Sequence, residues 1–191
     1  MPKAPVGGGV QLYYEEYGEG APLVLVHEFA GELASWKPQI HFFSRRYRTI
    51  AYNARGYPPS DVPEDPRAYS QMQAVADIKG ILDHLKIPRA HICGLSMGGY
   101  ATLHFGLHHP DRALSLIVAG AGYGSVKEKS EDFKRDSAVV VKQFEEGMGK
   151  VAEFYSRGPT RVQLLDKDPA GWREFFDLFA HLFVISKESL T

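Results

Sequence analysis

The pentapeptide Gly94-Leu95-Ser96-Met97-Gly98 lies between a short apolar run and a helical pattern, and it decides the interpretation of the whole chain. The run before it, residues 90–93, is typical of a strand, and the residues from Met97 to His108 are typical of a helix. Glycines on both sides of a serine permit a tight turn that lifts its side chain above the carboxyl edge of a sheet. The sequence therefore predicts a serine presented at a strand-to-helix elbow.

Strand patterns and amphipathic helix patterns alternate on both sides of this elbow. Strands are expected at Val10 to Tyr17, Pro22 to His27, Arg48 to Asn53 and Leu114 to Ala119, and helices at Ser35 to Arg46 and Ser70 to Leu85. This order predicts an α/β fold class with a doubly wound, mostly parallel sheet and right-handed crossovers.

The character of the chain changes after Gly124. The apolar positions beyond it follow helical spacing, first in one long helix that contains Val140, Phe144, Met148, Val151 and Tyr155, and then in a second that contains Trp172, Phe175, Phe176, Phe179, Leu182 and Phe183. No further strand is evident. We therefore expect two parts, a core at residues 1–124 and a helical cap or lid at residues 125–191.

Composition narrows the class of partner. The 191 residues include 22 basic and 23 acidic side chains, and their scatter along the chain argues against a nucleic-acid or anionic-membrane binder. No apolar run approaches the roughly 18 residues of a spanning helix, and Met1 to Gly20 does not resemble an export signal. Cys93 is the only cysteine, which fits a cytoplasmic location. A small-molecule or protein partner is expected, with no metal and no cofactor.

The elbow also predicts an electrostatic site. The helix that begins after Ser96 offers the backbone N–H of Met97 and the positive end of its dipole to an oxygen that develops negative charge. The alternative is a serine that merely caps a helix in a turn that tolerates glycine. The pattern favours Ser96 as a nucleophile, with Met97 as an oxyanion donor.

A second stretch makes the resemblance specific. Residues 53–60, Asn-Ala-Arg-Gly-Tyr-Pro-Pro-Ser, are similar to the Asp-x-Arg-Gly-x-Gly-x-Ser stretch of α/β-hydrolases, although Asn53 replaces the usual Asp and Pro58 a usual Gly. With the elbow, the chain resembles the esterase, epoxide-hydrolase and haloperoxidase-like group of that family, best over Val10 to Gly124. The resemblance assigns residues 53–60 a structural role beside the pocket.

The resemblance also implies a second oxyanion donor. His27-Glu28-Phe29-Ala30-Gly31 follows a buried strand, where esterases place an oxyanion loop, so the backbone N–H of Phe29 is the candidate. Glu28 stands where glycine is usual, and its carboxylate either repels anionic substrates or, as we favour, points to solvent. We place His27, Glu28 and Leu95 on the substrate side of the site, and we expect the His27 ring to serve as a structural hydrogen-bonding group.

The family's mechanism requires an acid and then a histidine after the serine. His104, His108 and His109 lie on the helix that begins at the elbow, roughly 12 to 20 Å from the serine along its axis. His181 falls in an aromatic stripe of the expected cap, where a packing role is more common than a base. The sequence thus identifies no base and no acid.

Three interpretations remain open. The chain is a C-terminally truncated or fragmentary serine hydrolase for a carboxylic ester or similar acyl substrate, with an acyl-enzyme mechanism and little activity alone. Alternatively, it is a non-catalytic small-molecule-binding or interaction protein on the same fold, or it is completed in trans by another chain. Truncation would leave the apolar strand Leu114 to Ala119 as an unpaired edge unless the cap helices or a partner cover it, which predicts marginal stability or self-association.

Overall fold

The computed structural model describes residues 1–122, 126–145, 147–159 and 161–181. The chain divides into two compact units, Met1–Ala121 and Gly122–Thr191. Gly124, after which the sequence places the boundary, lies outside the described residues.

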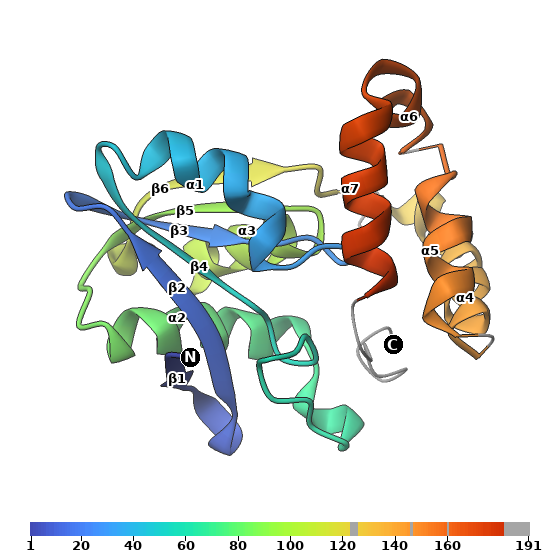
Figure 1. Cartoon of the computed structure of the whole chain (residues 1–191). Coiled ribbons are helices and arrows are strands. Elements are labelled where there is room, and N and C mark those ends of the chain that lie inside the picture. Colours follow the sequence, from blue (N-terminus) through green and yellow to red (C-terminus); the bar gives the residue numbers. More distant parts are fainter. Residues whose placement is uncertain (123–125, 146, 160, 182–191) are drawn as a thin grey trace. The chain divides into compact units, whose positions relative to one another are not determined.

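The first unit is built on a mostly parallel sheet (Figure 1). Its strands are β1 (Lys3–Pro5), β2 (Gln11–Tyr17), β3 (Ala21–Val26), β4 (Tyr47–Tyr52), β5 (Ala90–Leu95) and β6 (Ala113–Ala119), in the spatial order β1-β2-β4-β3-β5-β6. Strands β4, β3, β5 and β6 run parallel, whereas β1 and β2 pair antiparallel. The predicted α/β class is confirmed. β1 was not predicted, because three residues ending in a proline are too short to show a strand period.

Helices cover both faces of this sheet. Helix α1 (Lys37–Phe43) packs against Leu23 and Leu25 of β3, while α2 (Gln71–His84) and α3 (Met97–His108) pack on the face that carries Val24 and Val26. Successive residues of β3 therefore enter opposite cores, which explains its unbroken apolar run. The helix expected at Ser35 to Arg46 is present as α1, but it is shorter and follows a 3-10 turn at Leu33–Trp36.

The second unit is helical, with α4 (Ser130–Glu145), α5 (Met148–Ser156), α6 (Val162–Lys167) and α7 (Pro169–Ala180) in its described part. The prediction of a single long helix through Tyr155 is wrong, because Gly147, with φ = 102°, separates α4 from α5. In α7 the buried Trp172 donates its indole N–H to the Ser156 carbonyl at 2.8 Å, which ties α7 to the end of α5. Leu182 and Phe183, expected in the last helix, lie outside the described residues.

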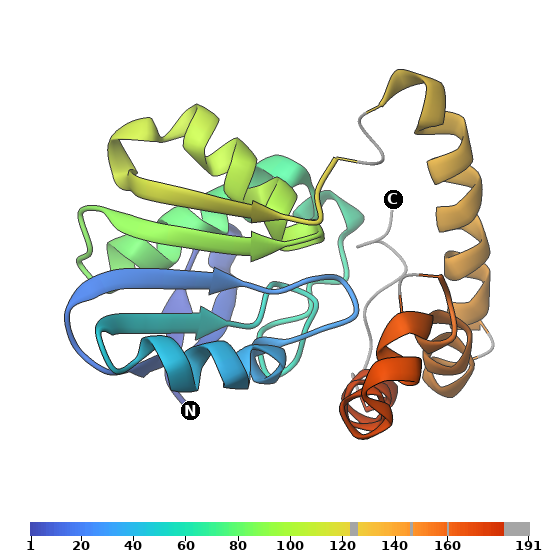
Figure 2. The same cartoon turned by 90° about the horizontal axis from the view of Figure 1, so that it is seen from above.

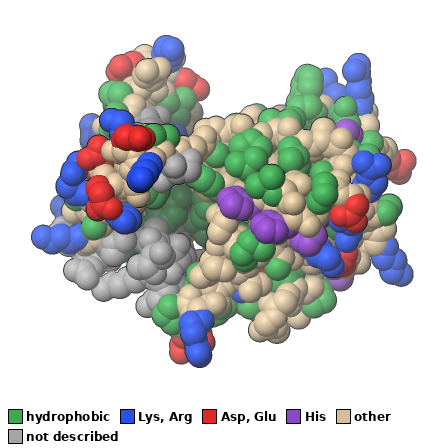
Figure 3. Space-filling view, turned by 180° about the vertical axis from the view of Figure 1, so that it is seen from behind, with side chains coloured by type: hydrophobic (Ala, Val, Ile, Leu, Met, Phe, Trp, Pro, Cys, Tyr) green, Lys and Arg blue, Asp and Glu red, His purple; other side chains and the backbone are tan. Residues whose placement is uncertain are grey.

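Strand β6 is an edge of the sheet as far as the structure describes the chain. Its Leu114, Ile117 and Val118 are 42%, 50% and 39% exposed, and Leu103 and Leu107 of the neighbouring α3 are exposed as well. The view from behind shows hydrophobic side chains beside a row of histidines (Figure 3). The strand carries no charge and no proline, the features that usually protect an open edge.

Candidate active site

Ser96 occupies the turn between β5 (Ala90–Leu95) and α3 (Met97–His108). The parallel strands end at one edge of the sheet (Figure 2). The Ser96 backbone has φ = 52° and ψ = −113°, a left-handed φ that side chains with a Cβ rarely adopt. Such a conformation costs on the order of 1–3 kcal/mol and persists only where its surroundings enforce it. The Ser96 N–H donates to the Ala119 carbonyl at 2.8 Å, so the elbow is tied to the end of β6.

Both glycines of the pentapeptide are required by close backbone contact. A Cβ on Gly94 would lie 2.1 Å from the Gly98 carbonyl oxygen, and a Cβ on Gly98 would lie 2.2 Å from the Val26 oxygen and 2.6 Å from the His27 oxygen. No side chain fits at these distances. The elbow is therefore pressed against the end of β3, and this contact brings Ser96 and Met97 next to the loop that begins at His27.

His27 organises that loop. Its ring is 1% exposed, and Nε2 accepts a hydrogen bond from the Ala54 N–H at 3.0 Å while Nδ1 lies 2.7 Å from the Glu28 carbonyl oxygen. Nδ1 must therefore carry the proton, which makes the ring a neutral imidazole that donates to Glu28. Burial lowers the pKa of His27 to about 4, which maintains this form. With both nitrogens occupied, the ring serves the loop and has no nitrogen left to bond a substrate.

The bond from His27 also orients Phe29. The Glu28 carbonyl accepts from His27 and from the Gly31 N–H at 3.2 Å, and this carbonyl belongs to the same peptide group as the Phe29 N–H. In a trans peptide the C=O and the N–H point in opposite directions. Holding the carbonyl therefore fixes the direction of the Phe29 N–H. Glu28 and Phe29 are half-buried, as is Leu95, whose side chain packs against the core on the α1 face.

The loop after β4 is tied down by the side chains of residues 53–60. Asn53 accepts from the Leu33 N–H at 2.8 Å and donates to the Pro58 carbonyl at 2.7 Å, and the Ser60 hydroxyl donates to the Asn53 carbonyl at 2.6 Å. These bonds confirm the structural role expected for this stretch. Asn in place of the usual Asp keeps the oxygen that accepts from the Leu33 N–H. It adds an N–H group that donates to the Pro58 carbonyl.

A buried ion pair anchors the same loop to α2. The Arg55 guanidinium donates two hydrogen bonds to the Asp77 carboxylate, at 2.7 and 2.6 Å, and a third to the Ala68 carbonyl at 2.7 Å. The two side chains are only 7% and 2% exposed. A bidentate arrangement of this kind holds its partners in one geometry.

Tyr57, in the same loop, was not identified from the sequence. Its hydroxyl donates to the Phe29 carbonyl at 2.9 Å and also lies 3.8 Å from the sulfur of Met97. The family pattern accepts any residue at this position, so the motif gave no signal. The structure thus brings Ser96, Met97 and the loop from His27 to Phe29 together, with Tyr57 between them.

The histidines after the elbow do not reach Ser96 along α3. His104 and His108 stack on each other with ring centroids 6.2 Å apart, and His109 packs against Phe105 beyond the helix end. At 1.5 Å per residue, His104 already lies roughly 12 Å from Ser96 along the axis. In the second unit, the Nδ1 atom of His181 lies 2.6 Å from the Asp177 carbonyl oxygen. Among the described residues of the first unit, no histidine forms a hydrogen bond with the Ser96 hydroxyl.

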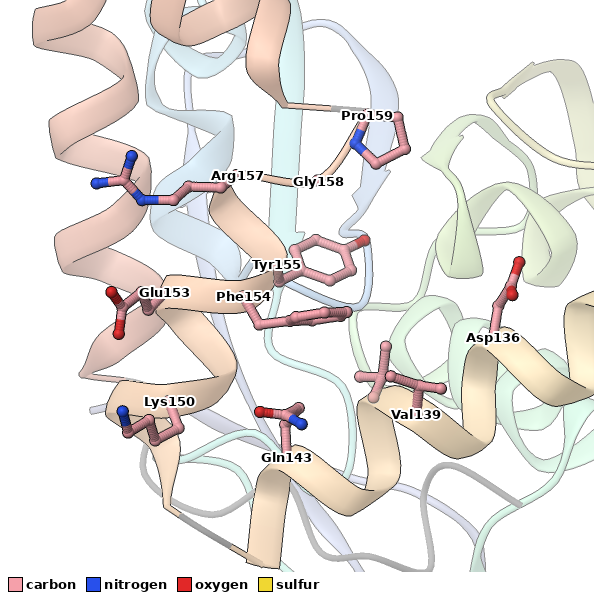
Figure 4. Close-up of a pocket in the computed structure, with 11 residues that line it drawn as sticks. Asp136, Val139, Gln143, Lys150, Glu153, Phe154, Tyr155, Arg157, Gly158 and Pro159 are labelled. Carbon is pink, nitrogen blue, oxygen red and sulfur yellow. The ribbon is translucent and has the colours of Figure 1, made fainter.

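The second unit contains a hollow of about 840 Å³ between α4 and α5 (Figure 4). Phe154 and Tyr155 project into it from α5, opposite Val139 of α4. The hollow is also lined by the charged residues Asp136, Lys150, Glu153 and Arg157. Its size is within the range of small-molecule pockets. The part of the chain that the structure describes shows no group of three or more metal-ligating side chains. It also shows no helix long and apolar enough to cross a membrane.

Comparison with known proteins defines the class. The family model described as the alpha/beta hydrolase fold matches residues 21–165, and the chain therefore belongs to that family. It is 35% identical over 112 residues to 3-oxoadipate enol-lactonase 2 of Acinetobacter baylyi, and 33% identical over 110 residues to epoxide hydrolase 3 of Siraitia grosvenorii. These alignments cover 58% and 57% of this chain but only 41% and 35% of the two relatives.

Solved structures agree with this assignment. The enol-lactonase from Burkholderia xenovorans matches with a TM-score of 0.78 and 29% identity, over 99% of this chain and 70% of that one. A hydrolase from Pseudomonas aeruginosa matches with a TM-score of 0.82 and 25% identity, over 99% and 69%. The chain thus spans less than half the length of the two curated relatives in sequence and about 70% of these two structures.

Proposed function

We propose that this chain carries the nucleophile and oxyanion donors of a serine hydrolase that acts on a carboxylic ester or similar acyl substrate. The observation that carries the proposal is the strained Ser96, held at φ = 52° by glycines that admit no side chain. Strain of this kind is retained where it presents a reactive group. The capping alternative does not account for it, because the Ser96 side chain forms no hydrogen bond that caps α3.

The chemistry follows from the groups around the serine. The Ser96 oxygen attacks the acyl carbon, and the carbonyl oxygen gains a negative charge that the N–H groups of Met97 and Phe29 stabilise. The C–O bond to the alcohol then breaks, and the acyl group stays on Ser96 until water hydrolyses it. The serine proton must pass through a base to the departing alcohol, and no such base is identified in the described residues. Oxyanion donors and binding alone leave roughly 10³ to 10⁴-fold catalysis over water, so we expect slow turnover by this chain alone.

Ester chemistry is also favoured by the relatives. Two of them carry the name enol-lactonase, and a lactone is a cyclic ester. A serine at the elbow suits acyl transfer, in which a tetrahedral oxyanion forms. We propose that Glu28 and Leu95 line the substrate side of the site, and that His27 contributes through the loop it holds. The second unit is proposed to act as the cap, and the single cysteine favours a cytoplasmic location.

A second candidate is a non-catalytic binding protein. It is favoured by one observation, that no histidine in the described residues of the first unit bonds to the Ser96 hydroxyl. Such a protein would keep the pocket and bind an ester or acid without turnover. For either candidate we propose self-association through the exposed edge at β6.

A fluorophosphonate probe tests the proposal, because phosphonylation requires a reactive serine and the same oxyanion donors. We expect Ser96 to be modified, slowly, in the wild-type chain and not at all after Ser96→Ala, as read by mass spectrometry of the peptide. Hydrolysis of an activated aryl ester should show the same dependence on Ser96. Modification that is unchanged by Ser96→Ala contradicts the proposal, and ligand binding without any modification supports the second candidate.

A further inference from the structure

Tyr57 is buried between the two segments that carry the proposed oxyanion donors. Its side chain is 2% exposed, and its ring packs edge-on against the His27 ring with centroids 4.6 Å apart. The hydroxyl has a single proton, which the Phe29 carbonyl accepts at 2.9 Å, while the Met97 sulfur at 3.8 Å is a second, weaker acceptor. One side chain from the loop after β4 thus touches both the loop after β3 and the start of α3.

The hydrogen bond from Tyr57 is the second of two bonds that fix the backbone of Phe29, and we call this pair of bonds the Phe29 clamp. The peptide group before Phe29 is held through the Glu28 carbonyl by His27, and the peptide group after it is held through the Phe29 carbonyl by Tyr57. A residue whose two flanking peptide planes are both fixed has little freedom in φ or ψ. The direction of the Phe29 N–H is therefore set from both sides.

The contact between the Tyr57 hydroxyl and the Met97 sulfur links the Phe29 clamp to the elbow at Ser96. Two N–H groups stabilise one oxyanion only if both lie within about 3.1 Å of the position that this oxygen will occupy. Because Phe29 and Met97 come from different loops, their spacing depends on whatever touches both. We propose that Tyr57 is a positioning residue that sets the Phe29 N–H against the Met97 N–H, an inference that rests on the proposed serine hydrolase function.

The competing explanation is that Tyr57 only fills space beneath the site. Tyr57→Phe separates the two, because it keeps the ring against His27 and removes only the hydroxyl. Tyr69→Phe is the matched control, since the Tyr69 hydroxyl also donates to a backbone carbonyl, that of Pro63 at 2.8 Å. The control removes the same kind of bond, from a hydroxyl that donates to Pro63 instead of Phe29.

Three measurements are made on the full chain. The Met97 methyl resonance is followed in protein labelled with ¹³C-methyl methionine, amide hydrogen exchange is measured for residues 27–31, and the rate of Ser96 phosphonylation is measured with the fluorophosphonate probe. We expect Tyr57→Phe to shift the Met97 resonance, to speed exchange in the loop and to slow phosphonylation by about 10-fold, a fraction of the 10² to 10³-fold that follows complete loss of a donor. Tyr69→Phe should leave all three as in the wild type.

The outcomes separate this inference from the function on which it rests. An unchanged Met97 resonance and unchanged loop exchange in Tyr57→Phe overturn the positioning role, as does an unchanged rate of phosphonylation when the wild-type chain is modified. If the resonance and the exchange change but the wild-type Ser96 is never modified, the contact between the two loops is supported and the hydrolase proposal fails instead.

Discussion

Gly98 packs so closely on Val26 that a Cβ at Gly98 would lie 2.2 Å from the Val26 carbonyl oxygen. Because the obstacle is backbone, Gly98→Ala must displace either β3 or α3. Overpacking costs about 1–3 kcal/mol of unfolding free energy, and we expect the upper end of this range here. Urea unfolding followed by circular dichroism measures the loss.

Gly7→Ala is the matched control for that substitution. A Cβ at Gly7 meets only the end of the Gln73 side chain, at 3.5 Å, which is ordinary van der Waals contact. We expect its unfolding midpoint to stay at the wild-type value. Equal midpoints for the two alanine variants would show that the elbow does not need the close approach at Gly98.

The backbone strain at Ser96 predicts an unusual order of stabilities. At φ = 52° a Cβ is unfavourable, so Ser96→Gly should be about 1 kcal/mol more stable than Ser96→Ala, while both lose phosphonylation. At Ser44, where φ is −61°, the order should reverse, because glycine gives up more chain entropy than alanine. Thermal unfolding of the four variants tests this. The same order at both positions would contradict strain at the elbow.

The ion pair between Arg55 and Asp77 should contribute stability only as a pair. Asp77→Asn leaves a buried guanidinium without its counter-charge, which costs about 3–5 kcal/mol. The double variant Arg55→Met with Asp77→Leu removes both charges and should recover much of that loss. Asp65→Asn, in an exposed pair with Arg67, is the control and should leave the urea midpoint unchanged. A double variant no more stable than Asp77→Asn would argue against this account.

The core of the fold could be predicted because its signals are local. The run at β3 alternates between two buried faces, and the elbow needs glycine at fixed positions, so the apolar pattern and the glycines appear directly in the sequence. The break between α4 and α5 could not be predicted in this way. The apolar spacing continues through Gly147, and a glycine within a helical pattern is compatible with either a continuous helix or a break.

The candidate site was predictable only in part. Ser96, Met97 and the loop at His27 follow from motifs, and the structure brings these segments together. Tyr57 could not be found, because its role depends on contacts with Phe29 and Met97, which lie 28 and 40 positions away in the chain. Such contacts become visible only when the three loops meet at one edge of the sheet.

His27 predicts a specific dependence of stability on pH. Its pKa is about 4 in the folded chain against 6.5 when exposed, so between these values the unfolded chain binds a proton that the folded chain does not. The contribution to stability is complete above about pH 6.5, falls as the pH drops toward 4 and levels off below it, with a total of about 3 kcal/mol. Urea unfolding of the wild-type chain and of His27→Asn is measured across this pH range. The difference between the two free energies of unfolding gives the contribution of His27. Parallel curves for the two proteins would mean that His27 is not buried as a neutral ring.

The open edge at β6 predicts association of one chain with another. Ile117 is 50% exposed on a strand without charge or proline, and an added strand would pair with the side of β6 that has no neighbouring strand in the described residues. We expect sedimentation velocity to show oligomers whose share rises with protein concentration, and Ile117→Lys to shift them toward monomer, because a charge resists pairing at an edge. Phe42→Lys is the control, since it replaces a 65% exposed side chain on α1, away from this strand. A wild-type chain that stays monomeric, or an equal effect of both lysines, would show that β6 is not the surface through which copies meet.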